Sequence, residues 1–596
     1  MWQVANRRVR HILLGVALLG GGALQAQDAV PPTAPVGAPK SLLPDDIAPA
    51  AALPANPAER PPPEPAVAIL PSDAPPARQP PPFAPEAAAA LLVPEVEALN
   101  PLADLAGPVG QPEDAGLLTP ATGGYGADLF ARSDGRFLAV LLHRIEAPVA
   151  SRWAQILLTR ALLSRAAPPA GLNPANWVAA RADALVATGS ATDAHRMVSR
   201  IALDRYTQSL YSVAGHAALA AGDPIALCPL ATTAFSITEM PFWQLSDAMC
   251  SAVLGDDFGA SQQFDRLRKD KALDGFDIGL AERIASAAGG GRRAANPEWQ
   301  DVSGLTAWRI GLSSAAGLDV PDSFLGAASL AQKAWLVRLP GQSVARRATL
   351  GPVVAASGAI SSAELNRLFA AEAATLDPTA LASSPGGQLR VANNTQDSAQ
   401  RIQALKALWS RAEAGSPEHY GWLVATALAA ARVPPSAGSA ADSPEIAAAL
   451  VSAGLTREAS AWWPASADLP DAQRARLWAQ LVAIDPSIDS DDALFQAWSA
   501  DAPPHRAALL SAGLAGLGRK PPDDLPAAID NLWTRALDRA VAGRRTGEVM
   551  LLTATGLQGR WRDVPPDYLR RIAAALSAVG HAAEARLIVA EAASRG

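Results

Sequence analysis

The sequence contains little cysteine, few aromatic residues and few charged residues. Two cysteines occur in 596 residues, and aromatic and charged residues make up 5% and 18% of the chain. The 7 histidines are scattered, and no pair has the HExxH spacing of a zinc site. Neither a GxxxxGK[ST] phosphate loop nor a GxSxG nucleophile elbow occurs. We therefore expect no metal, no cofactor and no catalytic residue, and the sequence does not predict an enzyme.

The balance of charge argues against nucleic acid as a partner. The formal net charge is -7, and the basic residues, nearly all arginine, do not form a cluster. A protein that binds DNA or RNA needs clustered cations to neutralise phosphates. We expect proteins or peptide segments as partners instead.

The N-terminus has the pattern of an export signal. Arg7, Arg8 and Arg10 precede an apolar run at 12–24, and Ala26 offers a small residue for cleavage. The run is shorter than the roughly 20 residues that span a bilayer. We predict a signal peptide at 1–26 and a periplasmic protein. The alternative is an uncleaved signal that anchors the protein in the inner membrane, facing the periplasm.

Composition divides the rest of the chain. Proline and alanine dominate 27–115, which predicts a disordered linker because such a segment has little to bury. Helical patterning follows, with no sustained alternation of β-branched residues. We expect helical repeats at 127–270, an irregular helical region at 271–430 and further helical repeats at 431–596.

A repeat provides the most specific signal for the fold. Gly189, Gly222 and Gly255 stand 33 residues apart, and each is followed by a residue able to cap a helix. Glycine accepts the left-handed conformation that ends a helix. Twelve residues before each glycine is a bulky residue, and seven before it is a small one. These positions hold Trp177, Leu210 and Trp243, and then Ala182, Gly215 and Ala248. Gly454 and Gly580 have similar surroundings.

This pattern resembles the tetratricopeptide family, in which helical hairpins of about 34 residues stack side by side. The resemblance is good over 176–270, adequate over 443–463 and 566–595, and poor between them. It implies an all-α fold of stacked hairpins, an α-solenoid, and carries no catalytic residues. Its inner face, lined by the first helix of each hairpin, usually binds peptides. On that face Arg181, Tyr211 and Asp247 are our candidate partner-binding residues.

The two cysteines, Cys228 and Cys250, are a candidate disulfide. In an oxidising compartment a pair of cysteines favours a bridge over a metal site. In the repeat they fall in neighbouring antiparallel helices, at about the same distance from the turn that joins them. The alternative is two buried thiols that point apart.

Three functions remain open. A scaffold for interactions between envelope proteins agrees with the export signal, the linker and the repeat. A cell-wall enzyme with a superhelical body is the second, but the Glu-Ser pair of exported transglycosylases is absent. A structural spacer without a discrete ligand is the third. The acidic run at 485–492 predicts a helix start capped by Ser490, not a calcium loop.

Overall fold

The computed structural model describes residues 110–596, except 146–147, 272, 290–296, 522–523 and 526. In this part of the chain all regular elements are helices, and extended contacts are limited to four isolated β-bridges. The predicted all-α fold class is therefore confirmed. The predicted signal peptide and residues 27–109 of the predicted linker lie outside the described residues.

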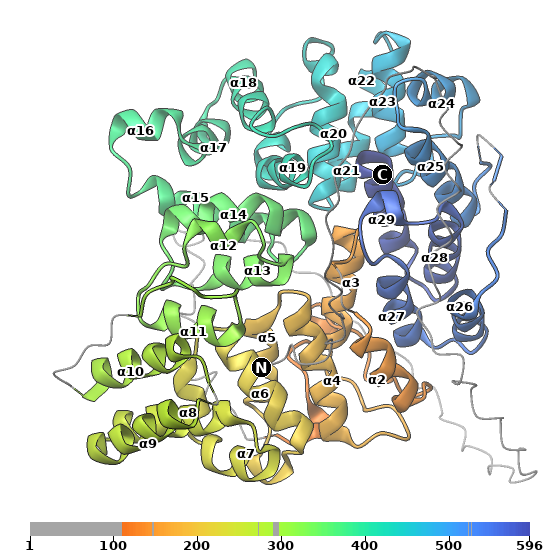
Figure 1. Cartoon of the computed structure of the whole chain (residues 1–596). Helices are drawn as coiled ribbons and strands as arrows, with labels where there is room; N and C mark the ends of the chain where they lie inside the picture. The colour runs from red at the N-terminus through yellow and green to blue at the C-terminus, as the bar shows by residue number, and fades with distance from the viewer. Residues whose placement is uncertain (1–109, 146–147, 272, 290–296, 522–523, 526) are drawn as a thin grey trace, which may run out of the picture. The chain divides into compact units, whose positions relative to one another are not determined.

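Most helices pack against the next helix along the chain (Figure 1). The helices up to residue 270 are α2 (Gly135–His143), α3 (Arg152–Leu163), α4 (Pro174–Ala187), α5 (Ala191–Val198), α6 (Gln208–Ala220), α7 (Ala231–Thr238), α8 (Pro241–Val253) and α9 (Asp257–Asp270). The middle region holds α10 (Gly275–Gly289), α11 (Ala307–Ala315), α12 (Asp322–Leu325), α13 (Leu330–Arg338), α14 (Val344–Ser357), α15 (Ser362–Ala373), α16 (Pro378–Ser383), α17 (Pro385–Asn394), α18 (Ser398–Trp409) and α19 (Pro417–Ala430). The C-terminal region holds α20 (Ser443–Ser452), α21 (Thr456–Ser460), α22 (Trp462–Ala465), α23 (Asp471–Leu481), α24 (Asp492–Ser499), α25 (Pro504–Gly516), α26 (Leu532–Ala542), α27 (Thr546–Gly556), α28 (Pro566–Ala578) and α29 (Ala582–Arg595).

The folded part begins before the predicted end of the linker. Gly110 donates its N–H to the carbonyl of Arg200 at 2.6 Å, and Ala115 is 5% exposed. Residues 110–115 therefore belong to the helical body, and the predicted boundary at 115 is corrected. The sequence did not indicate this boundary, because the proline at 112 was counted with the proline-rich linker. In the structure Pro112 is buried as the first residue of a short 3-10 helix, Pro112–Asp114.

The repeated glycines end helices as the sequence predicts. Gly189, Gly222 and Gly255 have φ of 93°, 75° and 95°, in the left-handed region. In each case the next N–H bonds back to a carbonyl five residues earlier, as from Ser190 to Leu185 at 2.7 Å. This bond satisfies a carbonyl that the helix end would leave unpaired. The same bond recurs after Gly454 and Gly580.

Two of the three residues predicted to cap a helix after these glycines do so. The carboxylates of Asp223 and Asp256 accept N–H bonds from Ala226 and Gly259, at 3.2 and 2.9 Å. Ser190 makes no side-chain cap, which corrects that prediction. Its backbone has the position of a cap, and α5 begins without help from the hydroxyl.

Small side chains lie where helices approach closely. Ala182 and Ala248 are 0% exposed, and a Cβ on Gly215 would lie 2.9 Å from the ring of Trp243. Trp177 and Trp243, the bulky partners of the repeat, are also buried. The region predicted to be irregular, 271–430, also has a small residue at a close crossing of two helices. A Cβ on Gly421 of α19 would lie 2.0 Å from the Pro352 carbonyl oxygen of α14.

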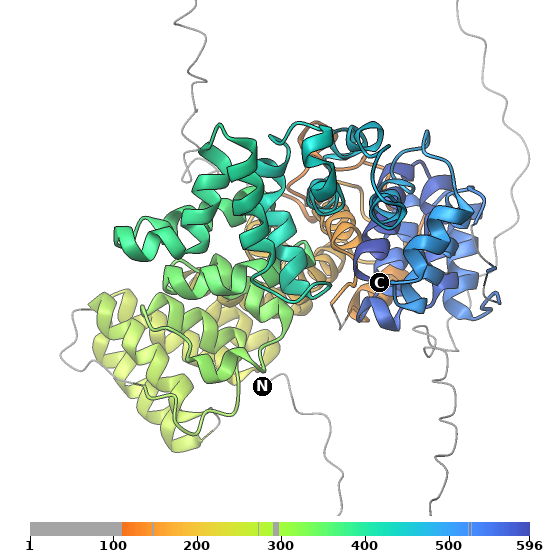
Figure 2. The same cartoon turned by 90° about the horizontal axis from the view of Figure 1, so that it is seen from above.

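One buried carboxylate joins the first and last parts of the helical body. Helix α3 packs against α14, α27 and α29, and from above it lies between the green and the blue helices (Figure 2). Glu591 of α29 is 0% exposed. It accepts the hydroxyl of Ser151 at 2.6 Å and the N–H groups of Arg152 and Trp153 at 2.9 and 3.3 Å. A residue near the C-terminus thus caps the N-terminus of α3.

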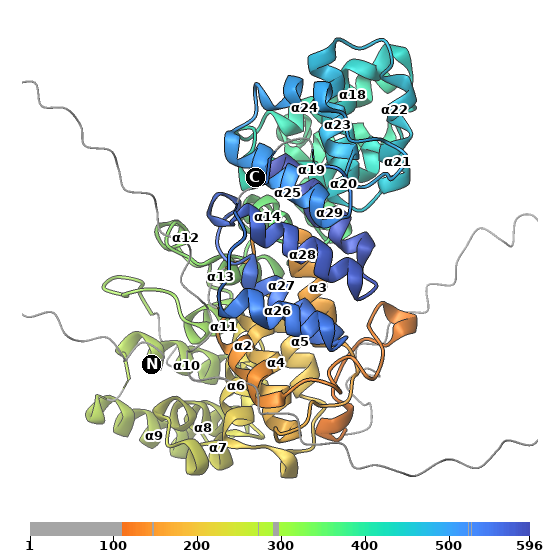
Figure 3. The ribbon, with the colours of Figure 1, turned by 90° about the vertical axis from the view of Figure 1, so that its right-hand side faces the viewer.

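The side chain of Arg152 extends the same junction to two further helices. Its guanidinium donates to the carbonyls of Ser452, at the end of α20, and Ile360, both at 3.1 Å, and also to that of Ala355 in α14. Arg595, one turn beyond Glu591, donates to Glu591 at 2.5 Å and to the Ala356 carbonyl at 3.2 Å. We call Ser151, Arg152, Glu591 and Arg595 the closing cluster. The four C-terminal helices α26–α29, seen side by side in Figure 3, present Glu591 to α3.

Replacing Glu591 by alanine is expected to destabilise the protein strongly. Arg595 and the first amides of α3 would lose their acceptor, and breaking a buried ion pair in this way costs about 3–5 kcal/mol. Urea denaturation followed by circular dichroism would show a lower unfolding midpoint. Glu458→Ala on α21 is the control, because Glu458 is exposed and a substitution at such a surface position changes stability by about 0.5 kcal/mol or less. Equal midpoints for the two variants would contradict a structural role for the closing cluster.

Candidate functional site

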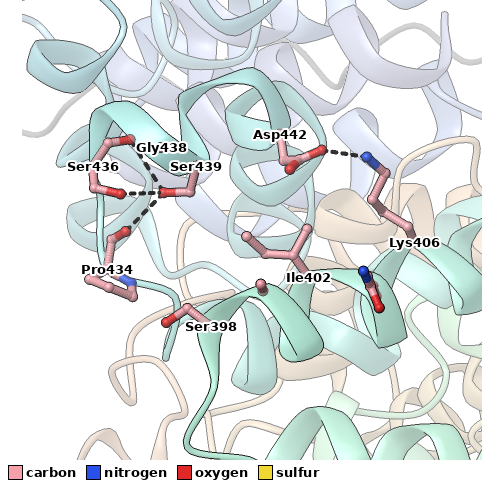
Figure 4. Close-up of a pocket in the computed structure, with 10 residues that line it drawn as sticks. Ser398, Ile402, Lys406, Pro434, Ser436, Gly438, Ser439 and Asp442 are labelled. Carbon is pink, nitrogen blue, oxygen red and sulfur yellow. Dashed lines mark hydrogen bonds and ion pairs between the residues drawn. The ribbon is translucent and has the colours of Figure 1, made fainter.

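An open pocket lies between α18 and the 3-10 helix Ala437–Asp442 (Figure 4). Its volume is about 640 Å³. It is lined by Ser398, Ala399, Ile402, Gln403, Lys406, Pro434, Ser436, Gly438, Ser439 and Asp442. Ten residues from two neighbouring segments thus form one shallow surface, which we call the α18 pocket.

The α18 pocket has a charged end and a hydroxyl end. At one end Lys406 donates to Asp442 at 2.8 Å, and this hydrogen bond raises the pKa of Lys406. At the other end the hydroxyls of Ser436 and Ser439 are 2.9 Å apart, and Ser439 also donates to the Pro434 carbonyl at 3.2 Å. Ile402 stands between the two ends (Figure 4). Such a surface can contact an extended segment through charge, hydrogen bonds and one apolar contact.

The polar side chains of this lining are largely paired with one another or with the backbone. Of the ten lining residues, Asp442 is the one carboxylate, and it is paired with Lys406. The serine hydroxyls contact each other and carbonyl oxygens, and the lining holds no histidine that could act as their base. In the part of the chain that the structure describes, no three His, Cys, Asp or Glu side chains form a group suited to a metal ion.

A second pocket, of about 380 Å³, lies beside α23 and the start of α24. The guanidinium of Arg474 lies over the ring of Trp463, 4.8 Å from its centroid, a cation–π contact. The acidic run contributes Asp489 and Asp491 to this pocket. Asp491, and not Ser490 as predicted, caps α24, because its carboxylate accepts the N–H of Ala493 at 2.9 Å. The predicted helix start is confirmed, but Ser490 has a buried hydroxyl without a hydrogen bond.

Arg181, a predicted partner-binding residue, is buried and has a structural role. It is 1% exposed, and it donates to the carbonyls of Leu162, Ser164 and Ala115 at 2.7, 2.8 and 3.0 Å. Burial lowers the pKa of Arg181 to about 10, so it remains charged at neutral pH. The guanidinium covers the C-terminal carbonyls of α3, where a cation is favourable. The prediction that it faces a partner is therefore corrected.

The other two predicted residues differ in exposure. Tyr211 is 5% exposed, and its ring packs against that of Tyr206 with centroids 5.0 Å apart. It is therefore also a core residue, which corrects the prediction. Asp247 is half-buried and accepts the hydroxyl of Thr232 at 2.9 Å. Its role in binding stays a prediction, and none of the three residues lines either pocket described above.

The two cysteines lie at disulfide distance. The sulfurs of Cys228 and Cys250 are 2.00 Å apart and their Cα atoms 5.4 Å apart. Cys250 is in α8, and α7 ends at Thr238 before α8 begins at Pro241, as the repeat predicts. Cys228 directly follows the 3-10 helix Pro224–Leu227, so the predicted second helix of that hairpin is interrupted at this point.

Comparisons with protein-family models, with curated proteins and with solved structures found no match to this chain. Within the described ranges, no helix has the length and apolar character needed to cross a bilayer. The α18 pocket and the second pocket were not anticipated from the sequence. Their linings mix polar and apolar residues, and most of these residues lie outside the segments that carry the repeat pattern.

Arg181→Ala is expected to lower stability by about 3 kcal/mol or more. Three buried carbonyls would lose their donor, and each unsatisfied group costs about 1–3 kcal/mol. Thermal unfolding of the variant would show a lower Tm. Arg205→Ala provides the control, since Arg205 is 54% exposed and pairs with the neighbouring Asp204. An unchanged Tm for Arg181→Ala, together with the loss of a binding partner, would restore the sequence-based role.

Proposed function

We propose that this protein is a periplasmic or envelope α-solenoid scaffold that binds segments of other envelope proteins. The α18 pocket is the observation that carries the proposal. It combines an ion pair, the exposed side chain of Gln403 and a central isoleucine along one open groove. A short peptide segment with polar and apolar residues is the ligand whose chemistry fits this lining.

The turns that end the helices support the assignment of the hairpins as tetratricopeptide-like. Tetratricopeptide-like hairpins are supported by three left-handed glycines at a spacing of 33 residues, with the same backbone bond after each. Buried small residues at the helix crossings agree with that assignment. Stacked helical repeats bury a continuous core and present an extended surface, which is the usual basis of their protein binding.

The compartment is supported by two independent features of the chain. The N-terminal residues have the order of an export signal. Cys228 and Cys250 lie at disulfide distance, and disulfides persist in oxidising compartments such as the periplasm. A scaffold in this compartment would act on proteins of the envelope.

Photo-crosslinking from the α18 pocket tests the proposal. A photoreactive amino acid at Gln403 of the full chain should capture a specific envelope protein in cells. We expect Lys406→Glu to reduce that product at least about tenfold, since reversing a charge within a contact costs several kcal/mol. The measurement is mass spectrometry of the crosslinked product.

Lys520→Glu is the matched control. Lys520 pairs with Asp492 at 2.9 Å, as Lys406 pairs with Asp442 at 2.8 Å, but it lies outside the α18 pocket. It should leave the crosslink unchanged. Capture of peptidoglycan fragments alone, or no specific product, would contradict the scaffold and favour the cell-wall enzyme or the spacer.

A further inference from the structure

The turn between α8 and α9 displays two large apolar side chains to solvent. Leu254 is 82% exposed and Phe258 is 75% exposed, the highest values among the large apolar residues of the described chain. They flank Gly255, one of the three repeat glycines. Phe258 is not needed for the core of α9, which buries Ala260, Phe264 and Leu267. We call Leu254, Gly255 and Phe258 the open turn.

The two equivalent turns earlier in the chain are covered by apolar side chains from one segment. A Cβ on Gly189 would lie 2.7 Å from the methyl of Ala334, and one on Gly222 would lie 2.5 Å from Leu339. Ala334 is in α13 and Leu339 directly follows it. Gly255 has no described atom within 4 Å of such a Cβ. The turns at Gly189, Gly222 and Gly255 form a row. Helix α13 and the residue that follows it cover the first two turns, and no described residue covers the third.

Another uncovered turn of the same kind carries no exposed aromatic residue. Gly580, between α28 and α29, has φ of 92°, and a Cβ on it would also have no described atom within 4 Å. Three residues after it stands Ala583, at the position that Phe258 has after Gly255. The open turn thus differs from a matched turn by a phenylalanine that contributes little to the fold.

The charge beside the open turn indicates which kind of ligand it favours. Asp256 and Asp257 are exposed and adjoin Phe258, while Arg266 lies about 13 Å further along α9. The half-charges at the end of α8 and the start of α9 have opposite sign and cancel. The apolar pair is therefore bordered by two exposed carboxylates, and neither forms an ion pair among the described residues. These carboxylates favour a ligand with basic residues beside its apolar ones.

We propose that the open turn binds an amphipathic helix of a partner protein, with leucine or alanine against Leu254 and Phe258 and lysine or arginine beside Asp256 and Asp257. The helix would continue the row that α13 begins on Gly189 and Gly222. This inference rests on the proposed scaffold function and names a second contact site and the chemistry of its ligand.

Titration of the full chain with two labelled synthetic helices tests the inference. Both helices carry Leu and Ala on one face, and the flanking positions are Lys in one and Glu in the other. We expect the Lys helix to bind the native protein at least about tenfold more tightly than it binds the Leu254→Ser/Phe258→Ser variant. The Glu helix should bind more weakly than the Lys helix. Fluorescence anisotropy measures both affinities.

Ile237→Ser is the matched control, since Ile237 on α7 is also an exposed apolar side chain, at 43%. It should bind the Lys helix as the native protein does. Both variants should keep the native Tm, because the residues that they change are exposed. Equal binding by the double variant, or equal binding of the Glu helix, would overturn the inference. A native dimer in sedimentation that the double variant loses would also overturn it, and would assign the open turn to a second copy of the chain.

In-cell crosslinking separates this inference from the scaffold function. A photoreactive residue at Phe258 should capture an envelope protein, and one at Ala583 should not. If Gln403 captures a partner and Phe258 captures none, the open turn is refuted and the scaffold stands. If neither position captures a protein, both are refuted.

Discussion

The helical body depends on the burial of the Glu591 carboxylate. A carboxylate removed from water must find donors, and Glu591 finds them in Ser151, Arg152 and Arg595. The first amides of α3 in turn require an acceptor, because the first N–H groups of a helix have no carbonyl partner within the helix. Each group satisfies the other although Ser151 and Glu591 are 440 residues apart in the chain. The helices at the two ends of the helical body are thereby fixed to each other.

Arginine has a related function throughout the molecule. Arg152, Arg181 and Arg519 each donate to two or more backbone carbonyls at or beyond the ends of helices. A body of many short helices has many unpaired carbonyl ends, and the planar guanidinium with its five donors reaches several of them at once. This gives a physical reason for a chain that uses arginine in place of lysine without clustering its cations. It also explains why Arg181, predicted as a contact for partners, is part of the interior.

Local features of the fold could be predicted from the sequence, and contacts between distant segments could not. Gly189, Gly222 and Gly255 each impose a left-handed turn on their own neighbourhood, so their spacing alone indicates the hairpins. The positions of Cys228 and Cys250 follow from the same spacing. Glu591, in contrast, looks like any glutamate on an amphipathic helix. The α18 pocket is formed by a helix and a 3-10 segment that share no repeat pattern, so nothing in the sequence brings its two sides together.

Hydrogen–deuterium exchange of the amides of Arg152 and Trp153 tests the closure of the helical body most directly. The first amides of a helix normally exchange quickly, because no carbonyl of the helix accepts them. With Glu591 as their acceptor, both amides should exchange as slowly as the interior of α29. Exchange of both at the rate of exposed amides, while α29 stays protected, would contradict the account, because α3 and α29 would then not be joined through Glu591.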